Sequence, residues 1–215
     1  MRTIPREVEN YGHMKSIFCL SKLQIAVLIG TALGDGAIKK RGKFHRLHIK
    51  HGANQLFWAQ YKRNVFSNIS GMPVRVFNQK VGNKIYEFCE FVTLTHPEFS
   101  KYYQLFYPKG KKTITTQLIN ILQDPLSLAV WYMDDGCADN AGFCFNTQSF
   151  SLGEVEKLVK GLKLNFNLQT TTRKNKNGWI IYVPKVEVDH FLSLTFKHIL
   201  PQFHYKTIPY SMRNL

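Results

Sequence analysis

Nine residues, Leu28-Ile-Gly-Thr-Ala-Leu-Gly-Asp-Gly36, decide how the rest of this chain is interpreted. They form an apolar run of small residues that ends in one carboxylate and a glycine. Before them, Ser21 and Gln24 have the spacing of a capping box, a pattern typical of a helix start. Apolar residues then recur at helical spacing, and a glycine commonly follows the last turn of a helix. The stretch therefore predicts a helix from about Lys22 to about Gly34.

The end of this predicted helix has two unusual features. Asp35 stands at the C-terminal end, where the helix dipole disfavours a carboxylate, so a positive group is expected nearby. Gly30 and Gly34 are four residues apart, so one face of the helix has almost no side chains. A bare face allows a second backbone to approach closely. In isolation, the Asp–Gly pair also fits an ordinary helix C-cap.

A second stretch of the same kind is Leu128-Ala-Val-Trp-Tyr-Met-Asp-Asp-Gly136, in which Asp135 follows Asp35 by 100 positions. A second pair of matching segments supports a duplication. Lys112-Thr113-Ile114 recurs as Lys206-Thr207-Ile208, 94 positions later. Two features that return in the same order at nearly the same period indicate an internal repeat.

The two nine-residue stretches resemble the motif of the LAGLIDADG homing endonucleases, with the acid in the eighth place. The resemblance covers almost all of the chain from about residue 21. It implies an α+β fold in which two pseudo-symmetric αββαββα halves form a saddle of two antiparallel sheets. It is strongest in the second half, through Asn146-Thr-Gln-Ser-Phe150, Glu154-Val155, Leu158-Val-Lys-Gly-Leu162 and Tyr205-Lys206. The second motif departs from the pattern, because Val130, Trp131 and Tyr132 replace small residues there.

The order of predicted elements agrees with an α+β fold. Besides the motif helices, we expect helices over residues 54–69, 97–106, 151–164 and 186–198. Strands are expected over residues 37–51 as one hairpin, 74–80 with 84–94 as another, 143–148, and 168–173 with 179–183. This order divides the chain into an N-terminal extension (1–20), a first half (21–107), a linker (108–120) and a second half (121–215).

The charge of the chain indicates its partner. A formal net charge of +15 and a pI near 9.7 favour a polyanion, with a merely basic surface as the alternative. No apolar run approaches the roughly 20 residues of a membrane span. The N-terminus lacks the apolar core of a signal peptide, so secretion is not expected. The resemblance adds an intracellular, organellar compartment.

The two motif carboxylates predict a metal site. If the bare helix faces pack side by side, Asp35 and Asp135 end close together, and two like charges there would raise a pKa. A hard divalent cation with oxygen ligands removes this conflict. By resemblance the cofactor is Mg²⁺, with Mn²⁺ as a substitute, and Asp35 and Asp135 are metal ligands and catalytic acids. Alignment of the motifs leaves Gly34 and Asp134 as backbone-carbonyl ligands at most.

Two lysines and three histidines are further candidates. By resemblance, Lys112 and Lys206 match the catalytic basic residues near each scissile phosphate, where they would polarise water or neutralise transition-state charge. In isolation each is an ordinary solvated lysine, but their repetition in register favours the catalytic role. His45, His48 and His51 fall in one predicted strand, and we interpret them as groove contacts rather than as a metal site.

Basic and amide side chains along the predicted strands have two expected roles on DNA, with an ordinary solvated sheet face as the alternative. Side chains on one strand face could reach base edges in the major groove: Arg46, His48, Lys50, Arg75, Gln79, Asn146, Gln148 and Arg173. Side chains near turns are expected to meet phosphates: Lys39, Lys40, Arg41, Lys43, Lys80, Lys84, Lys174 and Lys176.

Taken with the resemblance, these residues predict a monomeric, Mg²⁺-dependent, site-specific endonuclease that cuts double-stranded DNA at a long, non-palindromic target and needs no protein partner. The resemblance implies cleavage across the minor groove. Two alternatives remain open. One is an intron maturase on the same fold, whose partner would be intron RNA. The other is a cleavage-inactive DNA-binding regulator, against which the presence of both motif acids argues.

Overall fold

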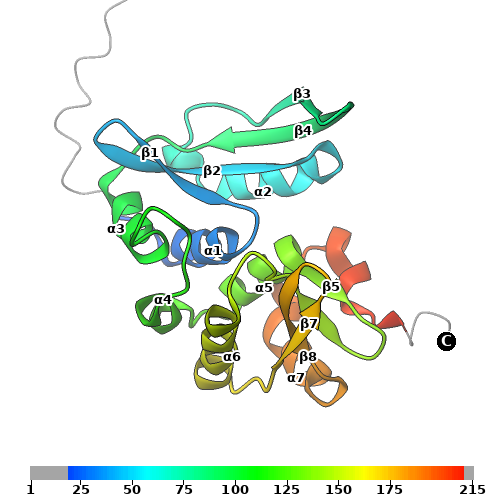
Figure 1. Cartoon of the computed structure of the whole chain (residues 1–215). Helices are drawn as coiled ribbons and strands as arrows, with labels where there is room; N and C mark the ends of the chain where they lie inside the picture. The colour runs from blue at the N-terminus through cyan, green and yellow to red at the C-terminus, as the bar shows by residue number, and fades with distance from the viewer. Residues whose placement is uncertain (1–18, 211–215) are drawn as a thin grey trace, which may run out of the picture.

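The computed structural model describes residues 19–210, so the expectations for residues 1–18 lie outside the described residues. The first half of the chain runs helix, hairpin, helix, hairpin, helix (Figure 1). Its elements are α1 (Lys22–Leu33), β1 (Ala37–Arg41), β2 (Phe44–Gly52), α2 (Leu56–Val65), β3 (Arg75–Val81), β4 (Lys84–Val92) and α3 (Pro97–Phe106). Short 3₁₀ segments flank α2 at Ala53–Gln55 and Ser67–Ile69.

The second half repeats this order. Its elements are α5 (Pro125–Asp135), β5 (Gly136–Ala138), β6 (Phe143–Phe145), α6 (Leu152–Phe166), β7 (Thr171–Asn175), β8 (Gly178–Val183) and α7 (Val188–Thr195), with 3₁₀ turns at Lys185–Glu187, Phe196–His198 and Pro201–Thr207. Between the halves, one short helix, α4 (Thr116–Ile121), begins within the predicted linker, and the side chain of Thr115 caps its N-terminus. The sequence analysis expected no helix there.

Each half forms one antiparallel four-stranded sheet, with strand orders β1-β2-β4-β3 and β5-β6-β8-β7. The matching orders confirm the predicted α+β fold of two pseudo-symmetric αββαββα halves. One strand was predicted wrongly. β6 ends at Phe145, and Asn146 and Gln148 follow it in a turn, where the Gln148 amide donates to Asn146 Oδ1 at 3.2 Å. The second half therefore has shorter strands at its centre than the first.

The motif helices α1 and α5 pack against each other between the two sheets (Figure 1). Glycine on α1 makes this approach possible. A Cβ atom at Gly30 would lie 2.4 Å from the carbonyl oxygen of Ser127, and one at Gly34 would lie 2.5 Å from Cβ of Asp134. Any side chain at these positions would push the helices apart. The predicted close packing is confirmed, and it is one-sided, because α5 contributes Val130 and Asp134 where α1 contributes glycine.

The first sheet has one covered face and one open face. Leu47, Ile49 and Phe91 are at most 3% exposed and pack in the helical core. The residues that alternate with them on β2 are more exposed, as the predicted strand alternation requires. Within the part of the chain that the structure describes, this second face is left uncovered. Among residues 19–210, no helix is long and apolar enough to cross a membrane.

Candidate active site at the ends of the motif helices

A lysine side chain occupies the C-terminal end of each motif helix. Lys112 Nζ donates to the carbonyl oxygens of Gly34 and Gly36, each at 3.2 Å. Lys206 Nζ donates to the carbonyl oxygens of Met133 at 2.7 Å and Asp134 at 3.4 Å. These lysines supply the positive charge that the unfavourable helix poles required. The repeated Lys-Thr-Ile segments thus place their lysines at equivalent positions in the two halves.

Asp35 has a histidine neighbour that the sequence analysis assigned differently. His51 Nδ1 lies 3.3 Å from Asp35 Oδ2, and His51 is only 4% exposed. Its position on β2 matches the parity of Leu47 and Ile49, so it belongs to the covered face of the sheet. His45 has the same parity, and it stacks on Tyr103. The interpretation of His45 and His51 as groove contacts is wrong.

Asp134 carries its side chain across the interface into the first half. Lys62 Nζ on α2 donates to both carboxylate oxygens, at 2.7 and 2.8 Å. Trp58 Nε1, one helical turn earlier, donates to Oδ1 at 2.6 Å. The side chains of Lys62 and Asp134 are both 0% exposed. A buried ion pair of this kind satisfies each charge only while the other is present.

The same cluster continues to the first motif acid. Lys62 Nζ lies 3.4 Å from His51 Nε2, and the His51 ring contacts Asp35 on its other side. The backbone N–H of Asp35 also points to Asp134 Oδ2 at 3.4 Å. A chain of polar contacts therefore runs from the second motif helix through α2 and β2 to Asp35.

The two motif acids have opposite pKa shifts. Burial, together with the negative charges of Asp35 and Asp134, raises the pKa of Asp135 to about 7. Burial also acts to raise the pKa of Asp35, but contact with His51 and the charges of Lys62 and Lys206 outweigh it and lower that pKa. Two acids in one site with divergent pKa values are a mark of functional carboxylates.

The three lysines of the site all have a lowered pKa. Burial lowers the pKa of Lys62, Lys112 and Lys206, while the neighbouring carboxylates act in the opposite direction. Lys206 and Lys112 are largely removed from solvent and Lys62 is fully buried, and all three lie beside the acids that they neutralise. A lysine in this setting polarises a bound group more strongly than a solvated one.

Three side chains of the site carry possible metal-ligating atoms that lie close together. One ligand atom each of Asp35, His51 and Asp134 lie within 4.8 Å of one another. The Asp134 carboxylate is already held by Lys62 and Trp58. The carbonyl oxygens of Gly34 and Asp134 accept from lysines, and a carbonyl retains a second lone pair for another partner.

The sequence analysis missed Trp58 and Lys62. Their spacing of four residues puts them on one face of α2, but a lysine within a helix normally lies in solvent. His51 could have been found, because strand alternation alone places it with the buried residues of β2.

The open face of the first sheet carries the predicted base-reading residues of the first half. Two of them contact Glu90, an acid that the sequence analysis did not name. Glu90 accepts from Arg75 Nε at 2.7 Å and contacts His48 Nε2 at 3.1 Å. Lys50 on β2 reaches across β4 and donates to Gln79 on the edge strand β3. In the second half, Arg173 pairs in the same way with Asp139.

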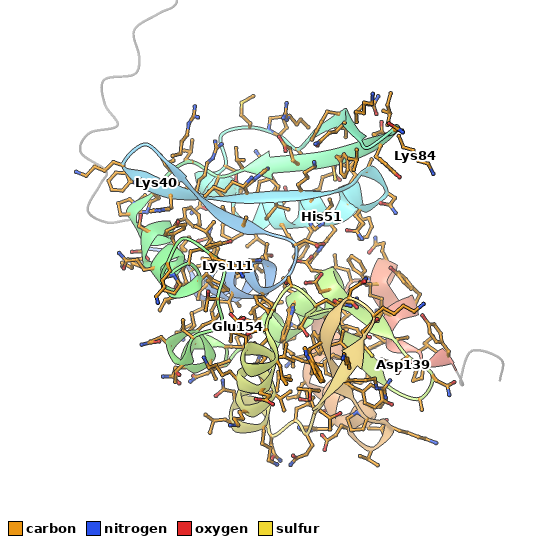
Figure 2. The ribbon with its side chains drawn as sticks, in the orientation of Figure 1. Lys40, His51, Lys84, Lys111, Asp139 and Glu154 are labelled. Atoms are coloured by element: carbon orange, nitrogen blue, oxygen red, sulfur yellow. The ribbon has the colours of Figure 1, made fainter. Side chains whose placement is uncertain are left out.

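The predicted phosphate-contacting lysines and arginine lie in the hairpin turns or in the strand residues near them. Figure 2 shows Lys40 and Lys84 at opposite ends of the first sheet, each pointing away from the core. These positions are exposed in both halves: Lys39, Lys40, Arg41, Lys43, Lys80, Lys84, Lys174 and Lys176. Arg173, Lys174 and Lys176 line a hollow of about 420 Å³ on the second sheet together with Asn146.

Known proteins share both the motifs and the architecture. The model of the LAGLIDADG DNA endonuclease family matches residues 25–191. Probable intron-encoded endonuclease 1 of Wickerhamomyces canadensis is 31% identical, over 88% of this chain and 85% of its own length. Cytochrome b mRNA maturase bI2 of Saccharomyces cerevisiae is 30% identical over 85% of this chain. The matched region is only 46% of the length of that relative.

A solved structure agrees with the sequence matches. The homing endonuclease I-WcaI bound to its DNA recognition sequence superposes with a TM-score of 0.86 and 28% identity, covering 96% of this chain and 95% of that chain. The likeness includes both halves, so the paired helices and both sheets are shared. With the family model and the intron-encoded relative in agreement, the chain belongs to the LAGLIDADG DNA endonuclease family.

Proposed function

We propose that this protein is a homing endonuclease that hydrolyses phosphodiester bonds in double-stranded DNA at a long, specific site. One observation carries the proposal. Asp35 and Asp135 stand at the ends of two packed motif helices, each helix end holds a lysine, and a sheet with basic residues flanks each side. The relation to I-WcaI, a structure bound to its DNA recognition sequence, supports DNA as the partner.

We propose that Asp35 and Asp135, with the carbonyl oxygens of Gly34 and Asp134, hold a divalent metal ion, Mg²⁺ or Mn²⁺. When bound, such an ion activates water and stabilises charge on the scissile phosphate. The chain itself orients the acids through the helix ends and through His51. Lys112 and Lys206 neutralise negative charge that develops on the phosphate oxygens.

Two sheets and one pair of motif helices lie within a single chain, so one chain would cover both halves of a duplex target. Because the halves differ in sequence, the target is expected to be non-palindromic. Light scattering of the DNA complex should give one chain per duplex, and two chains per duplex would refute the monomer. We also propose an organellar setting, because the relatives are named as intron-encoded endonucleases and cytochrome b mRNA maturases.

The test is selection of cleaved sites from a randomised duplex library in the presence of Mg²⁺, with parallel reactions in Mn²⁺ and in EDTA. One long recovered site, cut on both strands only with metal, is the expected result. Binding without cutting in either metal would instead indicate a DNA-binding regulator.

A second function has its own support. Maturase bI2 of Saccharomyces cerevisiae is 30% identical over 85% of this chain, which suggests intron RNA as an additional partner. A splicing assay with the intron that encodes this chain tests the idea. Splicing without any cleavage of DNA would favour the maturase and sink the endonuclease.

A further inference from the structure

The open face of the first sheet carries aromatic rings as well as basic groups. In the β3–β4 register, Phe77 pairs with Phe88 and Gln79 pairs with Tyr86. Directly paired residues of an antiparallel ladder share one face. Gly52 on β2 pairs with Phe88, and Lys50 pairs with Glu90, so the three rings lie on the same face as the predicted base-reading residues.

This aromatic cluster, defined as Phe77, Tyr86 and Phe88, has no helix above it among residues 19–210. The helices pack on the other face of the sheet, where Ile49 and Phe91 are buried. Tyr86 is 47% exposed, and both phenylalanines are partly exposed. Neighbouring apolar rings left open to water mark a contact surface for a partner.

The cations that lie against these rings limit the kind of partner that can bind there. Lys50 Nζ stands 3.9 Å from the ring centroid of Phe88, and the Arg75 guanidinium carbon stands 4.7 Å from that of Phe77. Each cation occupies one face of its ring. The rings are also tilted, by 33° between Phe77 and Phe88 and by 51° between Tyr86 and Phe88. Stacking of successive unpaired bases needs free ring faces, so this surface is poorly suited to single-stranded nucleic acid.

A duplex major groove presents one prominent apolar group, the C5-methyl of thymine, beside hydrogen-bonding atoms. We propose that Phe77, Tyr86 and Phe88 form a binding surface for thymine methyl groups in the part of the target that lies under β3 and β4. This inference rests on the proposed endonuclease function and adds a base preference to it. Lys50 and Gln79 stand beside the rings and can bond the polar edges of the same or adjacent bases.

The second half lacks a comparable cluster among its described residues. There the Arg173 guanidinium carbon lies 3.6 Å from the centroid of the single ring of Tyr182. Thymine preference due to methyl contacts is therefore expected in one half of the target and not symmetrically in both.

The experiment replaces thymine by deoxyuridine, which removes only the methyl group. After the cleavable target is known, each thymine is replaced singly, and binding and cleavage are measured with the full chain. Loss of one buried methyl contact is expected to weaken binding about fourfold. The effect should be confined to one or a few thymines at one end of the target.

Two variants assign the effect to the cluster. Tyr86→Ala and Phe88→Ala should bind thymine and deoxyuridine targets equally, because the ring that senses the methyl group is gone. Ile85→Ala is the matched control, since Ile85 is 72% exposed on the opposite face of the same hairpin and should keep full discrimination. Tyr86 lies at the surface, so its replacement keeps the test usable if Phe88→Ala fails to fold.

The outcomes separate this inference from the proposed function. Normal cleavage with equal use of thymine and deoxyuridine everywhere would overturn the methyl contacts and leave the endonuclease intact. Discrimination that survives Tyr86→Ala and Phe88→Ala together would also overturn the assignment. Tight binding of single-stranded RNA that depends on Phe88 would also overturn the methyl contacts, because it would show that the rings stack on unpaired bases. If the wild-type chain cuts no DNA with metal, both proposals fall.

Discussion

The two halves share a topology but differ at several positions of the motif helix, and one of these differences connects the two halves. Where the first half has Gly34, the second has Asp134, and the two meet at the helix interface. Asp134 uses the space above the glycine to reach Lys62 and Trp58 of the first half. Pseudo-symmetry of the backbone therefore does not make the two acid sites equivalent.

The supporting helices show the same difference. α2 buries Trp58, Ala59 and Lys62 against the interface. The buried residues of α6, which occupies the corresponding place, are Val155, Leu158, Gly161, Leu162 and Phe166. A polar cluster thus supports Asp35 through His51, whereas an apolar helix faces the core of the second half. Duplicated halves can keep one fold while their supporting helices differ, one with a buried polar cluster and the other with apolar residues.

The largest expected effect is a loss of cleavage, and it should be similar for the motif acid of either half. Asp35→Asn and Asp135→Asn should each reduce double-strand cleavage at least about a hundredfold, because each removes a proposed metal ligand. Specific binding should persist, since the sheets supply it. Gel-shift and cleavage assays on one target measure both quantities. Asp189→Asn, which alters an exposed acid on α7, is the control, and full double-strand cutting by Asp135→Asn would contradict the assignment.

The next effect is a loss of stability, and it should occur when a lysine is replaced on α2 but not when one is replaced on α6. Lys62→Met should destabilise the protein by about 3–5 kcal/mol, because it leaves the Asp134 carboxylate buried without its cation. Adding Asp134→Asn should restore most of that loss, since the remaining group is neutral and still accepts from Trp58. Urea denaturation measures both. Lys160→Met on α6 is the matched control at an exposed site and should change stability by less than about 0.5 kcal/mol. Equal losses for the single and double variants would show that the pair is not coupled.

The acids should also separate by pH in metal-free protein. The pKa of Asp135 is raised to about 7. Its contribution to stability is therefore complete below the unfolded-state pKa near 4 and is lost as pH rises through about 7. Asp35 has a lowered pKa, so its contribution is present above about pH 4 and is lost only as pH falls.

Urea denaturation in EDTA at pH 5, 6, 7 and 8 tests this contrast. The fall in stability over that range should be flattened by Asp135→Asn. Asp35→Asn should leave part of the fall, because burial and Asp134 still act on Asp135. Parallel curves for the wild type and Asp135→Asn would refute the raised pKa.

The smallest expected effect is a change in the salt dependence of DNA binding, and it should be the same in both halves. Lys43 lies in the β1–β2 turn and Lys176 in the β7–β8 turn. If each meets one phosphate, Lys43→Ala and Lys176→Ala should each reduce the slope of log affinity against log salt by about 1, on all sequences. Binding measured over a salt series decides this. A wild-type affinity that does not change with salt would mean that the net charge serves something other than DNA.

Local patterns were enough to predict most of the fold. Ser21 and Gln24 form the expected capping box, with Gln24 N–H donating to Ser21 Oγ at 3.2 Å. The glycine face of α1 predicted close helix packing, because only absent side chains allow it. α4 was missed because a helix of six residues carries little periodic signal. β6 was extended too far because polar alternation continues into the turn after Phe145.

The site was predictable only where it repeats. Lys112 and Lys206 were identified because the same tripeptide returns in register, and the structure places both at motif-helix ends. Lys62 has no repeat, and its role depends on Asp134, a residue 72 positions away that packs beside it through the tertiary fold. A contact of that range leaves no local pattern in the chain.

The crossing of Asp134 into the first half limits how such proteins can exchange parts. A chimera that joined this first half to another second half would need a carboxylate at the position of Asp134, or Lys62 would be buried without a counter-charge. Two copies of the first half assembled as a symmetric dimer would place Gly34 against Gly34 and leave two such lysines. The halves have therefore become a matched pair, and recombination between relatives must carry residues 62 and 134 together.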